Sequence, residues 1–131
     1  MPTEITILAW AAILLLVHIF AAVHLKTRQY GAKWNMGPRD EAQPPLDPIA
    51  GRLQRAQANY LATLPIAIIA LLGVVVANRT SATTALGGWI WLGARVAYIP
   101  LYAAGVPVVR TVAFAVSLVG LALVLKPLLV P

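Results

Sequence analysis

Arginine and asparagine side chains recur at helical spacing at the start of a segment that is otherwise apolar. Arg52, Arg55 and Asn59 stand at positions i, i+3 and i+7, which form one face of a helix. Polar groups in a membrane helix are costly to place and usually belong to a functional site. For Arg52 and Arg55 the alternative is interfacial anchoring, in which the long side chains reach the lipid headgroups.

The next apolar segment repeats this pattern. Arg95, Tyr98 and Tyr102 again stand at i, i+3 and i+7, and Arg110 follows after a short turn. For the two tyrosines the alternative is an aromatic belt at the membrane surface. Arg95 lies deep within its segment, where an unpaired cation is expensive. Since both polar faces lie toward the same membrane surface, we expect them to meet across one cavity.

Composition excludes several kinds of chemistry. The 131 residues include no cysteine, so the chain has no disulfide, no thiolate nucleophile and no cysteine metal site. Its two histidines lack a neighbouring carboxylate pattern, and we predict no metal site. The net charge of +6 lies beside the apolar segments without the aromatic platform of a nucleic-acid reader, so we predict anionic lipid headgroups as partners and no nucleic acid.

Four apolar segments hold the polar faces. Hydrophobic residues make up 60% of the chain, charged residues 11%, and the mean hydropathy is +0.82. At about 1.5 Å per residue, the first segment covers roughly 30 Å, one hydrocarbon thickness, and is too long for a cleaved signal peptide. We therefore predict one all-α domain over 1–131, an integral membrane four-helix bundle. The predicted spans cover residues 5–25, 52–77, 83–104 and 108–126.

The cations predict the orientation of these spans. Six of the ten lysines and arginines lie between Lys26 and Arg55, around a predicted loop over 26–51. The positive-inside rule places this loop in the cytoplasm and both termini on the other side, in the inner membrane if the protein is bacterial. Four prolines between Met36 and Pro48 prevent a continuous helix there and indicate a connector.

Three short motifs resemble a known family, the membrane-associated proteins in eicosanoid and glutathione metabolism (MAPEG). The family motif Arg-x-x-x-Asn-x-x-Glu, followed by a proline, resembles the run from Arg55 through Asn59 and Ala62 to Pro65. The segments 94–102 and 107–111 are also similar to the family. The resemblance covers essentially the whole chain and implies a homotrimer that binds glutathione as a cosubstrate near the cytoplasmic face.

By this resemblance, one subunit would hold glutathione and its neighbour would complete the pocket. The residues implied are Arg55, Gln57 and Asn59 from the first subunit and Tyr98, Tyr102 and Arg110 from the second, with Arg52 and Arg95 on the same two faces. Arginine binds carboxylates through paired, charge-assisted hydrogen bonds, and glutathione carries two. Arg110 would stabilise its thiolate for attack on a lipophilic electrophile arriving from the bilayer. Because the four spans hold no acidic residue, we expect subunit contacts to bury Arg95.

One position departs from the family motif. Ala62 stands where the motif has the glutamate that matches the α-amino group of glutathione. Three functions therefore remain open. The first is a glutathione-dependent transferase or peroxidase, and the second a lipid-binding or accessory membrane subunit without that activity. The third, a small transporter, lacks the expected inverted repeat.

Overall fold

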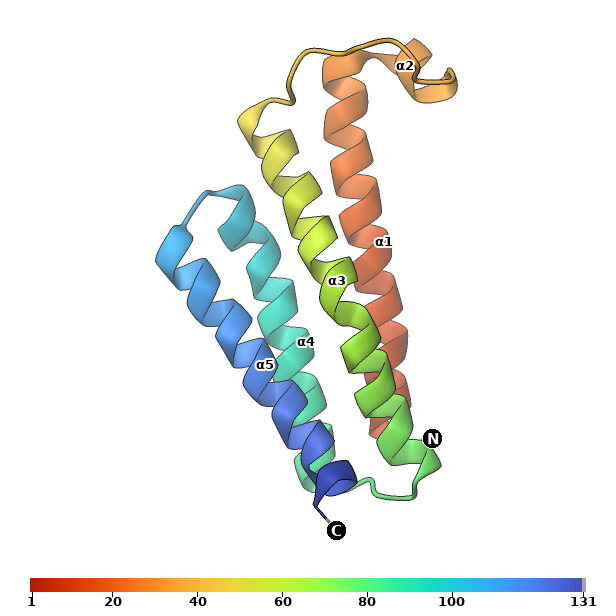
Figure 1. Cartoon of the computed structure of the whole chain (residues 1–131), viewed down its shortest axis with the longest axis vertical. Coiled ribbons are helices and arrows are strands. Elements are labelled where there is room, and N and C mark those ends of the chain that lie inside the picture. The colour runs from red at the N-terminus through yellow and green to blue at the C-terminus, as the bar shows by residue number, and fades with distance from the viewer. Residues whose placement is uncertain (131) are drawn as a thin grey trace.

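Four long helices and one short helix make up the computed structural model, which describes residues 1–130 (Figure 1). The helices are α1 (Thr3–Tyr30), α2 (Ala32–Met36), α3 (Pro48–Val76), α4 (Ala82–Ala103) and α5 (Pro107–Leu129). No strand occurs in the described part of the chain, which confirms the all-α prediction. The short α2 is an addition, since it lies within the loop predicted over 26–51.

Three of the long helices, α1, α3 and α5, are long and apolar enough to cross a membrane. These three spans support an integral membrane protein. At 22 residues α4 is about 33 Å long, also sufficient for a crossing. No membrane-length stretch of α4, which has Arg95 near its middle, reaches the hydropathy of the best stretches of the other three helices. A fourth crossing by α4 therefore stays a prediction.

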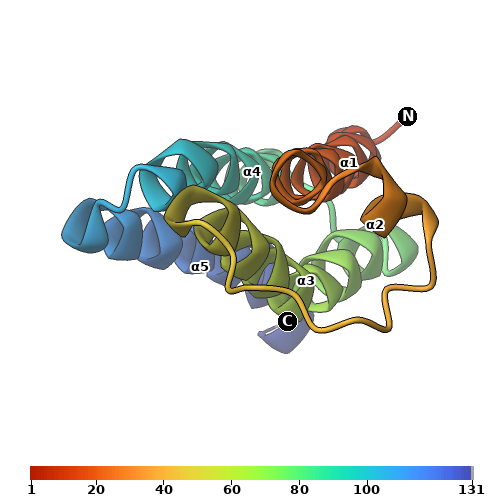
Figure 2. The same cartoon turned by 90° about the horizontal axis from the view of Figure 1, so that it is seen from above.

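The long helices alternate in direction, so both ends of the described chain lie at the same end of the bundle (Figure 1). Seen from above, α1 and α3 form one side, and α4 and α5 the other (Figure 2). The core between them includes Ile7, Tyr60, Leu71 and Trp91, all fully buried. Tyr60 stacks on buried His18 at 4.9 Å between ring centroids, so this histidine packs in the bundle interior.

Glycines let α4 and α5 approach each other closely. A Cβ atom added at Gly87 would lie 2.6 Å from the carbonyl oxygen of Gly120, too close for any side chain. Among the long helices, α4 and α5 are the most extensively packed pair. They therefore form a tight antiparallel hairpin that fixes the position of the α4–α5 turn.

The connector between α2 and α3 is anchored to the end of α1. The Tyr30 hydroxyl donates a hydrogen bond of 2.6 Å to the carbonyl of Pro44, and the Gln29 side chain donates one of 2.9 Å to the carbonyl of Pro45. Gln29 also accepts from the Asp47 backbone N–H at 2.8 Å. These bonds set the point at which α3 begins, with Pro48 as its first residue.

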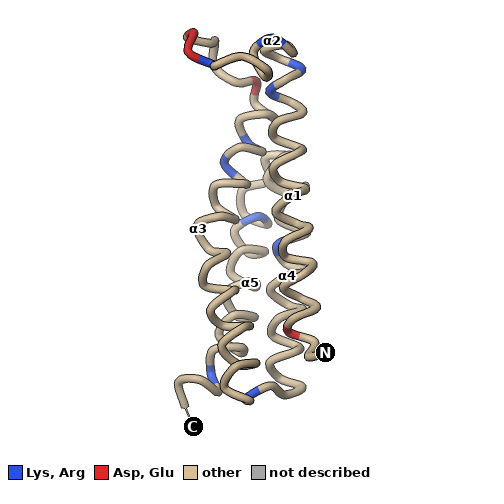
Figure 3. Tube along the Cα trace, turned by 90° about the vertical axis from the view of Figure 1, so that its right-hand side faces the viewer, with Lys and Arg blue, Asp and Glu red and all other residues tan. Residues whose placement is uncertain are grey.

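Charged residues are distributed unevenly along the bundle. Most cations lie in the half that carries the connector, and one acidic residue lies near the N-terminus (Figure 3). That residue, Glu4, is only 2% exposed and accepts a hydrogen bond of 2.5 Å from the hydroxyl of Thr84. Glu4 directly precedes the first predicted span, so it was not included when the predicted spans were found to hold no acidic residue. A carboxylate beside the first turn of α4 also complements the dipole of that helix.

Candidate functional site

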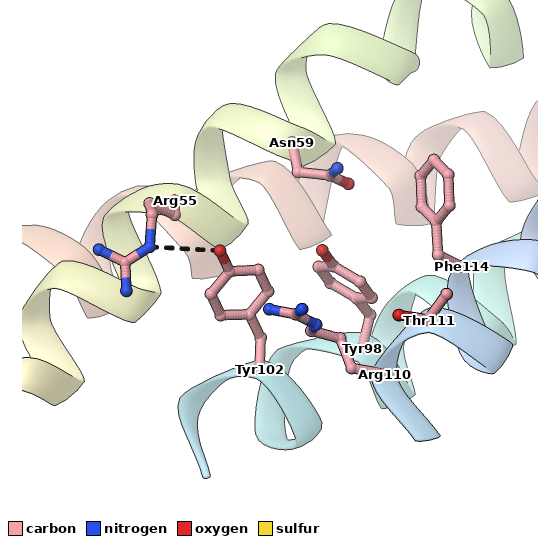
Figure 4. Close-up of a pocket in the computed structure, with 7 residues that line it drawn as sticks. All are labelled: Arg55, Asn59, Tyr98, Tyr102, Arg110, Thr111 and Phe114. Carbon is pink, nitrogen blue, oxygen red and sulfur yellow. Dashed lines mark hydrogen bonds between the residues drawn. The ribbon is translucent and has the colours of Figure 1, made fainter. Parts of the chain in front are cut away.

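A pocket of about 290 Å³ lies between α3, α4 and α5 (Figure 4). Seven residues line it: Arg55, Asn59, Tyr98, Tyr102, Arg110, Thr111 and Phe114. Five of the seven are site residues predicted from the sequence. A single chain brings these five together, whereas the resemblance divided them between two subunits.

Helix periodicity explains how these side chains converge. Arg55 and Asn59 are one turn apart on α3, and Tyr98 and Tyr102 are one turn apart on α4. Arg110 lies in the first turn of α5, which the α4–α5 turn brings back beside Tyr102. Gly105 enables that turn, since its φ of 72° lies in the left-handed region.

Tyr102 lies between the two guanidinium groups of the pocket. The Arg55 Nε–H donates to the Tyr102 hydroxyl at 3.3 Å, and the Arg110 Cζ lies 4.6 Å from the centre of the tyrosine ring. Among the described residues neither guanidinium forms an ion pair. Both therefore have N–H donors that can bind an anion in the pocket.

Arg95 lies behind the wall of this pocket. Its side chain is fully buried, and its Cζ lies 4.4 Å from the ring centre of Tyr98 and 5.5 Å from those of Tyr60 and Phe114. None of its three guanidinium nitrogens has a hydrogen-bond partner within residues 1–130. The expectation that subunit contacts bury Arg95 is wrong, because aromatic rings of its own chain enclose it.

Besides Arg95, two predicted site residues lie outside the pocket lining. Arg52 donates a hydrogen bond of 3.3 Å to the carbonyl of Ala103, where it caps the C-terminal end of α4. Gln57 is two residues from both Arg55 and Asn59, a rotation of about 200° around the helix. Its side chain therefore leaves α3 on the side away from the pocket.

Two lining residues, Thr111 and Phe114, had no predicted role. Phe114 is one helical turn after Arg110, so periodicity from that arginine could have identified it. Thr111 directly follows Arg110, and its hydroxyl donates to the carbonyl of Pro107 at 2.9 Å. In the described residues no group of histidines and carboxylates could hold a metal ion.

Comparison with known proteins identifies the family. The model of the MAPEG family matches residues 7–129, nearly the whole chain. The chain belongs to the MAPEG family. This confirms the resemblance inferred from the three motifs and makes the chain a membrane protein of a family in glutathione and eicosanoid metabolism. Neither a curated protein nor a solved structure matches it.

Proposed function

We propose that this MAPEG protein is a glutathione-dependent transferase or peroxidase acting on lipophilic electrophiles. The observation that carries the proposal is the pocket in which three helices bring together Arg55, Asn59, Tyr98, Tyr102 and Arg110. Two guanidiniums without carboxylate partners suit a ligand with carboxylates. Glutathione, a tripeptide with two carboxylates and a thiol, meets that requirement.

The bound cosubstrate would supply the nucleophile, because the chain has no cysteine. A free thiol has a pKa near ~8.5 and is mostly protonated at neutral pH. The Arg110 guanidinium, held over the ring of Tyr102, would favour the thiolate and lower the thiol pKa. In transfer, the thiol proton is released to solvent and the thiolate sulfur forms a bond to the electrophilic carbon. The bond from that carbon to its leaving group breaks, and the leaving group departs with the electron pair.

We propose further that the chain functions as a homotrimer. Arg55 and Thr111 are exposed in the single chain, so the pocket has an open side that a neighbouring subunit can close. The surface also carries many exposed apolar side chains suited to lipid or to a second copy, including Phe20, Ile69 and Val119. Mass measurement in mild detergent tests this assembly, and a monomer would contradict it.

A second candidate function follows from Ala62. Losing a hydrogen bond to a charged group costs about 1.5–3 kcal/mol, which corresponds to roughly 10- to 150-fold in affinity. A chain with alanine at this position could have lost glutathione chemistry and kept a binding or accessory role in the membrane. This alternative predicts no thiol turnover even when the pocket is occupied.

Titration calorimetry with glutathione, together with thiolate absorbance followed against pH, tests the proposed function. We expect binding at millimolar glutathione and a thiol pKa below that of the free tripeptide. Arg110→Ala should raise the pKa of the bound thiol toward its free value. Arg79→Ala is a matched control, because Arg79 bonds to the carbonyl of Pro127 at the other end of the bundle. Absence of binding and of thiol turnover would favour the accessory role.

A further inference from the structure

The pocket carries charge of one sign only. Arg55 and Arg110 contribute two guanidiniums, and the other five lining residues are neutral. Arg95 adds a third positive charge behind Tyr98 and Phe114, which both contact the pocket. An ammonium group that enters this pocket meets repulsion from three cations of the chain that lines it and no carboxylate of that chain.

Arg95 increases the energetic cost of this excess of positive charge. A fully buried cation without a hydrogen-bond partner is destabilising unless a nearby negative charge offsets it. The aromatic rings of Tyr98 and Phe114 lie against its guanidinium and also line the pocket. An anion bound there offsets the charge of Arg95, and an ammonium on the same ligand weakens that effect.

None of the acidic residues of the described chain lines this pocket. Asp40 and Glu41 line a separate pocket at the connector. Glu4 is hydrogen-bonded to Thr84 near the opposite end of the bundle. Asp47 precedes Arg55 by eight residues, about 12 Å along the axis of α3, and belongs to the connector anchored to α1. Ala62, which is exposed and lies on the helix face of Asn59, provides no acid either.

We propose that the pocket selects acidic thiols that carry no ammonium group, such as an N-acylated peptide thiol, over zwitterionic thiols such as glutathione. This inference rests on the proposed thiol-dependent function and names its preferred cosubstrate class. Glutathione would bind through its carboxylates with its ammonium unmatched. An acylated amine keeps the same carboxylates and thiol but removes the repelled charge.

The test compares glutathione with glutathione acetylated on its α-amino group, by titration calorimetry on the purified full chain. We expect the acetylated ligand to bind about tenfold more tightly, the scale of one interaction with a charged group. Ala62→Glu should reverse the order, because its carboxylate can pair with the free ammonium. Ala42→Glu adds the same charge in the exposed connector and should leave the order unchanged.

Tighter binding of glutathione than of the acetylated form by the unchanged protein would overturn the inference. If Asp47→Asn then removed that preference, the connector carboxylate would be the missing partner for the ammonium.

Turnover with a lipophilic electrophile separates the two proposals. If the protein prefers the acetylated thiol but shows no turnover, the selectivity is supported and the transferase function is refuted. If it turns over the electrophile but prefers glutathione, the transferase function is supported and the selectivity is refuted. If neither thiol binds at millimolar concentration, both proposals fail.

Discussion

Replacing Arg95 with methionine should stabilise the ligand-free protein while weakening its binding of anions. Arg95 is fully buried, and its nitrogens have no hydrogen-bond partner among residues 1–130. Burying a charge costs several kcal/mol. Contact with the face of an aromatic ring stabilises a cation by about 0.5–2 kcal/mol. One ring centre lies 4.4 Å from the Arg95 Cζ and two others lie 5.5 Å from it.

Methionine is flexible enough to fill this space, and its sulfur makes favourable contacts with aromatic rings of about 0.3–1.5 kcal/mol. Replacing buried charged groups with apolar residues of similar volume is often neutral or stabilising by about 1–4 kcal/mol. We therefore expect Arg95→Met to raise the thermal unfolding midpoint in detergent without ligand. Its affinity for an acidic thiol should fall, because the third positive charge near the pocket is lost.

Arg55→Met is the matched control, because Arg55 is exposed and its removal relieves no burial cost. We expect it to weaken acid binding without raising the unfolding midpoint. A lower midpoint for Arg95→Met than for the unchanged protein would refute the reasoning. It would mean that the buried guanidinium stabilises the ligand-free fold.

Three further predictions concern packing and topology. Gly87→Ala should destabilise the α4–α5 hairpin by about 1–3 kcal/mol through overpacking. Gly93→Ala, which has open space around its added Cβ, should be neutral or slightly stabilising. The thermal unfolding midpoints of the two variants in detergent test this. Tyr60→Phe should cost about 0.5–1.5 kcal/mol in the same assay, because it removes a buried hydrogen bond of 2.6 Å to a carbonyl of α1, and an unchanged midpoint would contradict this. Single cysteines at Gln43 and Ser81 should label from opposite sides of sealed vesicles, and labelling from one side would exclude the predicted orientation.

Helix periodicity was enough to predict the side chains that line the pocket from α3 and α4. Arg55 and Asn59, like Tyr98 and Tyr102, are one turn apart, so a shared face follows from spacing alone. Gln57 shows the limit of motif matching, since its spacing from both neighbours turns it away from them. The direction of its side chain follows from helix geometry rather than from membership of a motif.

The positions of Arg52, Arg95 and Glu4 depend on contacts between distant segments. Arg52 caps the end of α4, some fifty residues further along the chain, and Arg95 is enclosed by rings from α3 and α5 as well as α4. Glu4 pairs with Thr84 across the bundle. Spacing within one segment could not reveal any of these contacts. The ends of the helices could not be predicted from hydropathy either, because α1 continues to Tyr30, beyond the apolar run of its predicted span.

The composition of α4 has a consequence for how the protein is made. A helix with a central arginine enters a bilayer poorly by itself, because translocon insertion of that residue costs roughly 2.5–3.5 kcal/mol. The glycine contact between Gly87 and Gly120 pairs α4 tightly with the more apolar α5. During synthesis we therefore expect α4 to remain at the translocon until α5 emerges, and the two to partition into the membrane together as a hairpin.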